Sequence, residues 1–161
     1  MWTLALCKPA IRSQARVGDY VVAVWTKDLY GQVGLLHSVA LVTAVQSLAT
    51  YYGQRPVRRD QIYERMPDGE IRHRRNVRYH GSGPKEAQQR QRDMQGAVLL
   101  SRHFRVFDAS DPPEVDADGP LRGVVRHAIG HVKGTLEPDA VADLERLIYG
   151  REYDQIGRAH V

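Results

Sequence analysis

The segment LALCKPAIRSQARVGD places the only cysteine of the chain beside a lysine and a proline, with an arginine five residues later. Lys8 and Arg12 are cations of the kind that hold phosphates or base edges through charge-assisted hydrogen bonds. Cys7 would act as a nucleophile only as a thiolate beside a partner base, and no Cys–His motif is recognisable. Most free cysteines are small buried residues. We therefore predict Lys8 and Arg12 as ligand contacts and Cys7 as a core residue, the alternative being an ordinary strand and turn.

Arginine dominates the middle of the chain. Residues 55–105 hold thirteen lysines and arginines against six acidic residues, a net +7, whereas the rest of the chain sums to −3. Guanidinium groups bind oxyanions through paired hydrogen bonds, so this composition suits a nucleic-acid or nucleotide partner. The alternative is a solvated hairpin that its charges simply keep soluble. We predict phosphate contacts from four arginines of this segment: Arg65, Arg72, Arg74 and Arg75.

Two further pairs of side chains have the chemistry to contact a base. Asp93 and Ser101 flank a short apolar run. An aspartate there accepts hydrogen bonds from a base edge, acts as a general base, or simply caps a loop. Tyr20 and Trp25 stand at an odd spacing, which places them on opposite faces of a regular strand. We expect one ring to pack in the core and the other to stack on a flipped base, the alternative being core packing with one exposed ring.

The histidines do not make a convincing metal site. His127 and His131 stand four residues apart, a spacing that can place two imidazoles on one helical face. Gly130 between them weakens a helix, and the sequence offers no evident third ligand. The chain also lacks a phosphate-binding loop, a dinucleotide fingerprint and a His-Glu-x-x-His helix. We therefore predict no metal and no cofactor, and we exclude the common nucleotide-hydrolase and metalloprotease classes.

Apolar runs and turn residues predict the strands that must position these side chains. Strands are expected over 2–7, 20–25, 33–45, 62–66, 70–74, 97–101 and 103–107. The run 33–45 is long for one strand, so it should bend or bulge near Ser38. The turn Pro67-Asp68-Gly69 should join the fourth and fifth strands as a basic hairpin, because proline presets φ and glycine accepts a positive φ.

Two helices are predicted. Ser47 can cap a short helix that Gly53 stops, and Pro138 suits the first position of a longer helix that ends at Gly150. The stretch 81–92, rich in glycine, glutamine and arginine, is typical of a mobile loop. Short strands with a flanking helix or two predict an α+β fold, with a small, partly closed, mostly antiparallel β-barrel.

Composition predicts one globular domain in the cytoplasm. The chain has 161 residues, of which 42% are hydrophobic and 26% charged. No run approaches the length of a membrane span, no secretory signal opens the chain, and one cysteine cannot form an internal disulfide.

The last residues, IGRAHV, match the translation of a widely used sequencing adaptor. We therefore expect a domain over 1–154, a tail over 155–161 that derives from the adaptor, and a natural protein with different ends.

The order of the motifs resembles a known family. LALCKPAIRSQARVGDYVVAV is similar to the opening signature of the nucleotide modification associated domain family, type two, which reads Leu-Ala-x-Cys-Lys-Pro-x-Ile-Arg before Val-Gly-Asp and two aliphatic residues. DQIYERMPDGEIRHRRNVRYHGSGP, DMQGAVLLSRHFRVF and HAIGHVKG resemble later elements in the same order, over most of residues 3–149. The resemblance implies pocket roles for Asp19, Asp93 and His131. It also implies an association with DNA-base modification in phages and bacteria.

A looser resemblance links the two long aliphatic strands to the barrels of the PUA, EVE and ASCH group, which read or process modified bases. Our leading hypothesis is a PUA-like module that recognises a modified base or nucleotide in DNA. In it, Lys8, Arg12 and the hairpin arginines hold phosphates, while Asp93 and His131 read the base. The rival hypothesis is an enzyme that alters or hydrolyses a modified nucleotide with Asp93 or His131 as acid and base. A third is a protein-interaction domain whose basic face meets an acidic partner.

Overall fold

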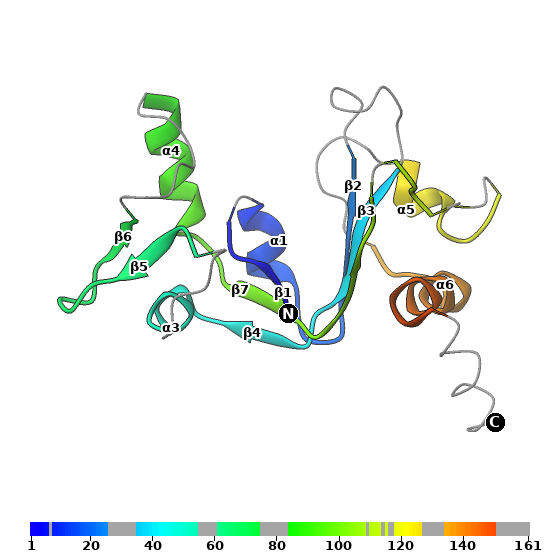
Figure 1. The fold of residues 1–161 in the computed structure, drawn as a ribbon, viewed down its shortest axis with the longest axis horizontal. Helices are drawn as coiled ribbons and strands as arrows, with labels where there is room; N and C mark the ends of the chain where they lie inside the picture. Colours follow the sequence, from blue (N-terminus) through cyan, green and yellow to red (C-terminus); the bar gives the residue numbers. More distant parts are fainter. Residues whose placement is uncertain are drawn as a thin grey trace. The chain divides into compact units, whose positions relative to one another are not determined.

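The computed structural model describes residues 1–6, 8–25, 35–54, 61–74, 84–108, 110–113, 115, 118–126 and 134–150. The strands within them are β1 (Trp2–Leu4), β2 (Tyr20–Val24), β3 (Leu36–Leu41), β4 (Ala44–Gln46), β5 (Tyr63–Arg65), β6 (Ile71–His73), β7 (Val98–Ser101) and β8 (His103–Val106). The helices there are α1 (Pro9–Gln14), α3 (Leu48–Tyr52), α4 (Pro84–Asp93), α5 (Arg122–Arg126) and α6 (Pro138–Tyr149). This mixture of helices with antiparallel strand pairs confirms the α+β prediction (Figure 1).

The chain divides into two compact units. Unit 1 comprises Met1–Trp2, Gly18–Thr43 and Ser101–Val161, and unit 2 comprises Thr3–Val17 and Ala44–Leu100. The formal charge divides with them, because unit 2 holds fourteen basic and six acidic residues whereas unit 1 holds nine and thirteen. Unit 2 therefore carries +8 and unit 1 carries −4.

Unit 1 is built on the antiparallel sheet β2-β3-β8. The register of β2 against β3 shifts, since Ala23 lies opposite Ser38 while the next residue of β2 lies opposite Leu36. His37 is the extra residue of this β-bulge. The bulge falls next to Ser38, where the sequence predicted it.

The core of unit 1 lies between this sheet and α6, which packs on β3 and β8. Pro138 opens α6 and Gly150 ends it, with the Gly150 N–H donating to the carbonyl of Arg146 at 2.8 Å. Leu144 and Ile148 are buried in the core, as their spacing predicts. The predicted helix, its first residue and its stop are therefore confirmed.

Unit 2 contains the sheet β1-β7-β4 and the short helix α3. Ser47 caps α3, because its Oγ accepts a hydrogen bond from the Thr50 N–H at 3.0 Å, as the sequence predicted. Helix α3 contributes Tyr51 and Tyr52, both fully buried, to the core of unit 2. That core consists of Ala5, Leu48, Tyr51, Tyr52, Ile62, Tyr63, Val98 and Leu100.

The predicted basic hairpin of unit 2 is also confirmed. Strands β5 and β6 pair antiparallel, with Tyr63 opposite His73. Gly69 in the connecting turn has a φ of 88°, and the Asp68 carboxylate accepts from the Glu70 N–H at 2.9 Å. The turn thus uses the residues whose local chemistry predicts it.

Three helices, α1, α4 and α5, occupy segments for which the sequence predicted no helix. Pro9, expected to end a strand, instead opens α1, because proline suits the first helical position where its missing N–H has no partner to lose. Helix α4 covers 84–92 of the stretch predicted as a mobile loop. Its residues after Pro84 are mostly good helix formers such as lysine, glutamine, alanine and arginine, which explains the helix. Residues 81–83 lie outside the described residues.

The predicted barrel is not found within the described residues. The strands there form three small sheets, of three, three and two strands, and none closes on itself. The apolar run predicted as one bent strand over 33–45 is interrupted at residues 42–43, so β3 joins one sheet and β4 joins another. Two short strands in different sheets do not supply the long curved strand that closes a small barrel.

Replacing Gly96 with alanine is expected to destabilise unit 2 by about 2 kcal/mol or more. Gly96 has a φ of +76°, and an added Cβ would lie 3.1 Å from the Arg12 Cβ and 3.2 Å from the Ser13 nitrogen. Urea denaturation followed by circular dichroism measures the loss. Gly123→Ala in α5 is the control, because a Cβ there meets nothing within 4 Å. Equal effects of the two substitutions would contradict the prediction.

Candidate functional site

Arg12 lies inside unit 2 and not at its surface. Its exposed fraction is 1%, and its guanidinium donates to the carbonyls of Ala5 and Asp93 at 2.8 Å each. Longer bonds of 3.3 and 3.4 Å reach the carbonyls of Ala97 and Arg92. The four acceptors come from the segment after β1, the last turn of α4 and the residue before β7. This geometry favours a structural role for Arg12, which joins three segments of unit 2, over the predicted contact with a ligand.

Asp93, the last residue of α4, lies in the same interior. Its exposed fraction is 1%, and its Oδ2 accepts a hydrogen bond from the Tyr63 hydroxyl at 3.4 Å. The Tyr52 hydroxyl donates to the carbonyl of Ala5 at 3.4 Å. Burial raises the pKa of Tyr52, the positive charge of Arg12 opposes that rise, and the negative charge of Asp93 adds to it. We call Arg12, Tyr52, Tyr63 and Asp93 the buried polar cluster.

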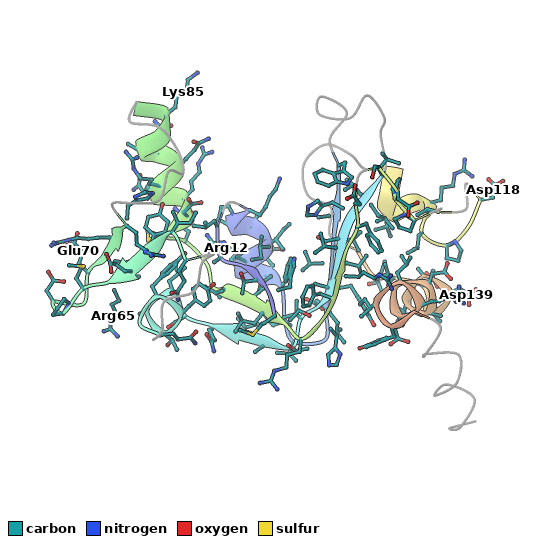
Figure 2. The ribbon with its side chains drawn as sticks, viewed as in Figure 1. Arg12, Arg65, Glu70, Lys85, Asp118 and Asp139 are labelled. Carbon is teal, nitrogen blue, oxygen red and sulfur yellow. The ribbon has the colours of Figure 1, made fainter. Side chains whose placement is uncertain are left out.

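Four cations of unit 2 are exposed and available to a partner. They are Lys8, Arg65, Lys85 and Arg92, and none makes a side-chain hydrogen bond or ion pair within the part of the chain that the structure describes. Lys8 precedes α1 with a left-handed backbone, at φ 41° and ψ 47°. Figure 2 shows Lys85 near the outer end of α4 and Arg65 pointing outward from the hairpin.

Arg72 and Arg74, two of the other predicted phosphate contacts, already have partners. The Arg72 guanidinium donates to the Glu70 carboxylate at 2.6 and 2.8 Å and forms an ion pair with Asp68 at 3.3 Å. Hydrogen bonding to Glu70 raises the pKa of Arg72, so its charge is fixed but locally compensated. Arg74 donates to the carbonyl of Gln61 at 2.8 Å. Arg65 is thus the hairpin arginine best placed to meet a phosphate among those described.

The two predicted aromatic contacts lie in unit 1. The Tyr20 ring packs against the core of that unit, and its hydroxyl donates to the Glu145 carboxylate at 3.1 Å. The Trp25 ring, just beyond β2, meets the His37 ring edge-on with centroids 4.3 Å apart. One ring thus lies against the core and the other against a histidine, so Trp25 remains the better candidate for stacking.

Two predicted polar contacts also lie in unit 1. Ser101 is fully buried, and its Oγ donates to the carbonyl of His103 at 2.7 Å while accepting from the N–H of the same residue at 3.0 Å. Asp19 is exposed, and its carbonyl accepts from the Val42 N–H at 2.8 Å. The structure thus brings Arg12 and Asp93 together inside unit 2, whereas Asp19 and Ser101 belong to the other unit.

The stability of unit 1 is expected to fall in acid because of His37. Burial lowers the pKa of His37 below its ordinary value of 6.5. The unfolded chain therefore binds the proton more readily, so this part of the stability is full above pH 6.5 and falls as the pH drops toward the folded-state pKa. Melting temperatures followed by tryptophan fluorescence from about pH 7.5 to pH 5 should fall more steeply for the wild type than for His37→Gln. Parallel profiles would contradict this role.

Several predicted residues lie outside the described part of the chain: Cys7, Arg75, His127, His131 and the tail 155–161. Among the described residues, no group of three or more histidine, cysteine or acidic side chains is placed to hold a metal ion. The described helices include none with the length and apolar character needed to cross a membrane.

Sequence reasoning missed α4 as a source of surface cations. A signal was present, since Pro84 opens the segment and the residues that follow it are mostly good helix formers. The glycine, glutamine and arginine content of the stretch 81–92 indicated a mobile loop instead, and α4 has no apolar face. The tyrosines of the buried polar cluster were also missed, because their sequence neighbourhood indicates only ordinary core packing.

The fold and the distribution of charge define an α+β protein whose excess positive charge lies in one of two compact units. The family model described as nucleotide modification associated domain 2 matches residues 1–159, and the chain belongs to that family. This confirms the resemblance carried by the sequence motifs and indicates a role associated with nucleotide modification. Neither the curated proteins nor the solved structures include a match to this chain.

Proposed function

We propose that this chain recognises a modified base in DNA, as part of a phage or bacterial DNA-modification system, and that unit 2 binds the nucleic acid. The charge of unit 2 carries the proposal: it is +8, and Lys8, Arg65, Lys85 and Arg92 are exposed and unpaired within the described residues. Contacts to phosphate supply most of the affinity of proteins for nucleic acid. Family membership supports the link to modified nucleotides.

The environment of Asp93 favours recognition over catalysis by that residue. A general base must reach the proton that it removes. Asp93 has an exposed fraction of 1%, accepts from Tyr63, and shares its interior with the Arg12 guanidinium. These contacts suit a residue that stabilises unit 2. The alternative, an enzyme acting on a modified nucleotide, then rests on His131, which lies outside the described residues.

Fluorescence anisotropy with the full chain tests the proposal. Duplex and single-stranded oligonucleotides with plain or modified cytosine and thymine are titrated at two salt concentrations. We expect one modified base to be preferred, and the preference to persist at the higher salt while overall affinity falls. Binding that ignores the modification and disappears at higher salt would contradict base recognition.

A pair of double variants locates the binding unit. Lys8→Ala/Arg65→Ala should weaken binding to every oligonucleotide by roughly the same factor, because phosphate contacts are independent of sequence. Arg105→Ala/Arg122→Ala removes the same charge from exposed positions of unit 1 and is the matched control. A larger effect of the control would place the nucleic-acid contacts in unit 1.

Incubation of the wild type with modified nucleotides, followed by chromatography, tests the enzymatic alternative.

A further inference from the structure

The side chains of helix α4 that the structure describes are polar apart from Ala87, and they form no apolar stripe. Lys85, the side chains at 87–89, Gln91 and Arg92 are exposed, and Arg90 is half-buried. Asp93 is the buried residue among the described side chains of the helix. Figure 1 shows α4 extending away from strands β5 and β6 of the same unit. Packing of an apolar face, which holds most helices of globular proteins in place, therefore does not hold α4.

The contacts that fix α4 gather at its C-terminal end. The Arg12 guanidinium donates to the carbonyls of Asp93 at 2.8 Å and Arg92 at 3.4 Å, which belong to the last turn. A cation is favourable there because the last carbonyls of a helix lack partners and the helix dipole is negative at that end. The buried carboxylate of Asp93 adds the contact with Tyr63. One end of α4 is therefore anchored in the interior, and the rest is presented to the outside.

The exposed face of α4 combines cations with amides. Lys85, Gln88, Gln89 and Arg92 follow the spacing i, i+3, i+4, i+7, which places them on one face. All four are exposed, and the cations at the two ends are separated by about 10 Å of helix rise. Lysine and arginine neutralise phosphate, whereas glutamine and arginine donate hydrogen bonds to the edges of adenine and guanine.

This geometry favours duplex DNA as the partner. The major groove of B-form DNA is about 12 Å wide and admits an α-helix, whereas the major groove of A-form RNA is too narrow for its bases to be read. The major groove also displays the C5 position of pyrimidines, where the methyl group of thymine projects. A substituent at C5 would therefore lie against a helix inserted in that groove.

We propose that α4 enters the major groove of duplex DNA, with Lys85 and Arg92 on phosphates and Gln88 and Gln89 on base edges beside a C5-modified pyrimidine. The inference rests on the proposed function and specifies the element, the groove and the position of the modification. In this proposal Arg12 is a positioning residue, because it holds the C-terminal end of α4 without contacting DNA.

Two double variants test separate parts of this proposal in the full chain, on duplexes containing cytosine, 5-methylcytosine or 5-hydroxymethylcytosine. Lys85→Ala/Arg92→Ala should lower affinity by roughly tenfold or more and reduce the slope of log K against log salt by about two, for two lost phosphate contacts. Gln88→Ala/Gln89→Ala should keep the slope and lower the preference for the modified duplex by roughly tenfold. Because all four side chains are exposed, circular dichroism and melting temperature should not change.

Protection of guanine N7 from dimethyl sulfate provides an independent readout, since N7 lies in the major groove. The wild type and Arg105→Ala/Arg122→Ala, which removes two cations from unit 1, should both protect N7, whereas Lys85→Ala/Arg92→Ala should not.

Three results would overturn the proposal. If Lys85→Ala/Arg92→Ala binds as tightly as the unit 1 control, α4 is not the contact, although the proposed function survives. If the wild type prefers single strands or duplex RNA to duplex DNA, insertion in the major groove is wrong. If the wild type binds no nucleic acid under any condition, both the proposed function and this inference fail.

Discussion

Replacing Arg12 with methionine is expected to lower the free energy of unfolding of unit 2 by about 3–5 kcal/mol, although methionine is also long and unbranched. The substitution removes every donor to the carbonyls of Ala5 and Asp93 that the guanidinium supplies at 2.8 Å. A buried acceptor left unsatisfied costs about 1–3 kcal/mol, and the Ala5 carbonyl would keep only the longer bond of 3.4 Å from the Tyr52 hydroxyl. The substitution also leaves the buried carboxylate of Asp93 without the positive charge in its cluster. Lost hydrogen bonds and lost charge compensation therefore act together.

Urea denaturation measures the global loss, and hydrogen exchange measured by mass spectrometry locates it. Faster exchange should appear first in α4 and in the segment before β7, because the carbonyls that Arg12 holds belong to them. Arg16→Met is the matched control, since Arg16 is exposed and donates to the carbonyls of Gln14 and Ala15. That change should stay within about 0.5 kcal/mol of the wild type. Equal losses for Arg12→Met and Arg16→Met would contradict the internal role of Arg12.

Arg12→Lys separates charge from geometry. Lysine keeps the positive charge but presents one compact ammonium group in place of a planar fork with several donors. It can therefore compensate Asp93 but cannot serve carbonyls on three segments at once. We expect a loss between those of the wild type and Arg12→Met. If Arg12→Lys is as unstable as Arg12→Met, the hydrogen bonds contribute nearly all of the effect.

The parts of the fold that sequence predicted well are those fixed by local chemistry. The Ser47 cap, the Pro67-Asp68-Gly69 turn and the Pro138 start each depend on residues within one turn of the chain. Helix α4 has no apolar pattern of its own, and the Arg12 side chain that donates to the carbonyls of its last turn lies about eighty positions earlier in the sequence. Local propensity favours a helix there, but the glycine, glutamine and arginine content of the stretch indicated a mobile loop.

In the candidate site, too, contacts between residues close in the sequence could be predicted and contacts between distant residues could not. The ion pair between Arg72 and Glu70 could be predicted from the sequence, since residues two apart in an extended segment share a face. The burial of Arg12 could not be predicted from the sequence, because arginine is mostly exposed in proteins. The carbonyls that accept its hydrogen bonds also cannot be identified from the residues near it. Sequence therefore located the segment with the excess positive charge, which belongs to unit 2, but could not separate internal from external cations.

Asp93→Ala is expected to lower the free energy of unfolding by about 3 kcal/mol, because it leaves the buried Tyr63 hydroxyl without its acceptor and opens a cavity in the interior of unit 2. Asp93→Asn should lose about 1–3 kcal/mol, since the amide oxygen still accepts from the Tyr63 hydroxyl but carries no charge. Urea denaturation of both variants measures these values. A loss for Asp93→Ala no greater than that for an exposed aspartate, such as Asp139→Ala in α6, would contradict this prediction.

The same variants separate recognition from catalysis. If Asp93 stabilises unit 2, folded Asp93→Asn should bind modified duplex DNA within a few-fold of the wild type, whereas a catalytic Asp93 would lose turnover with little loss of affinity. Tyr63→Phe removes the hydroxyl that donates to Asp93 at 3.4 Å. In a double-mutant cycle with Asp93→Asn, stability should show a coupling of about 0.5–3 kcal/mol and DNA affinity none. Coupling in affinity with none in stability would instead place both side chains against the bound DNA.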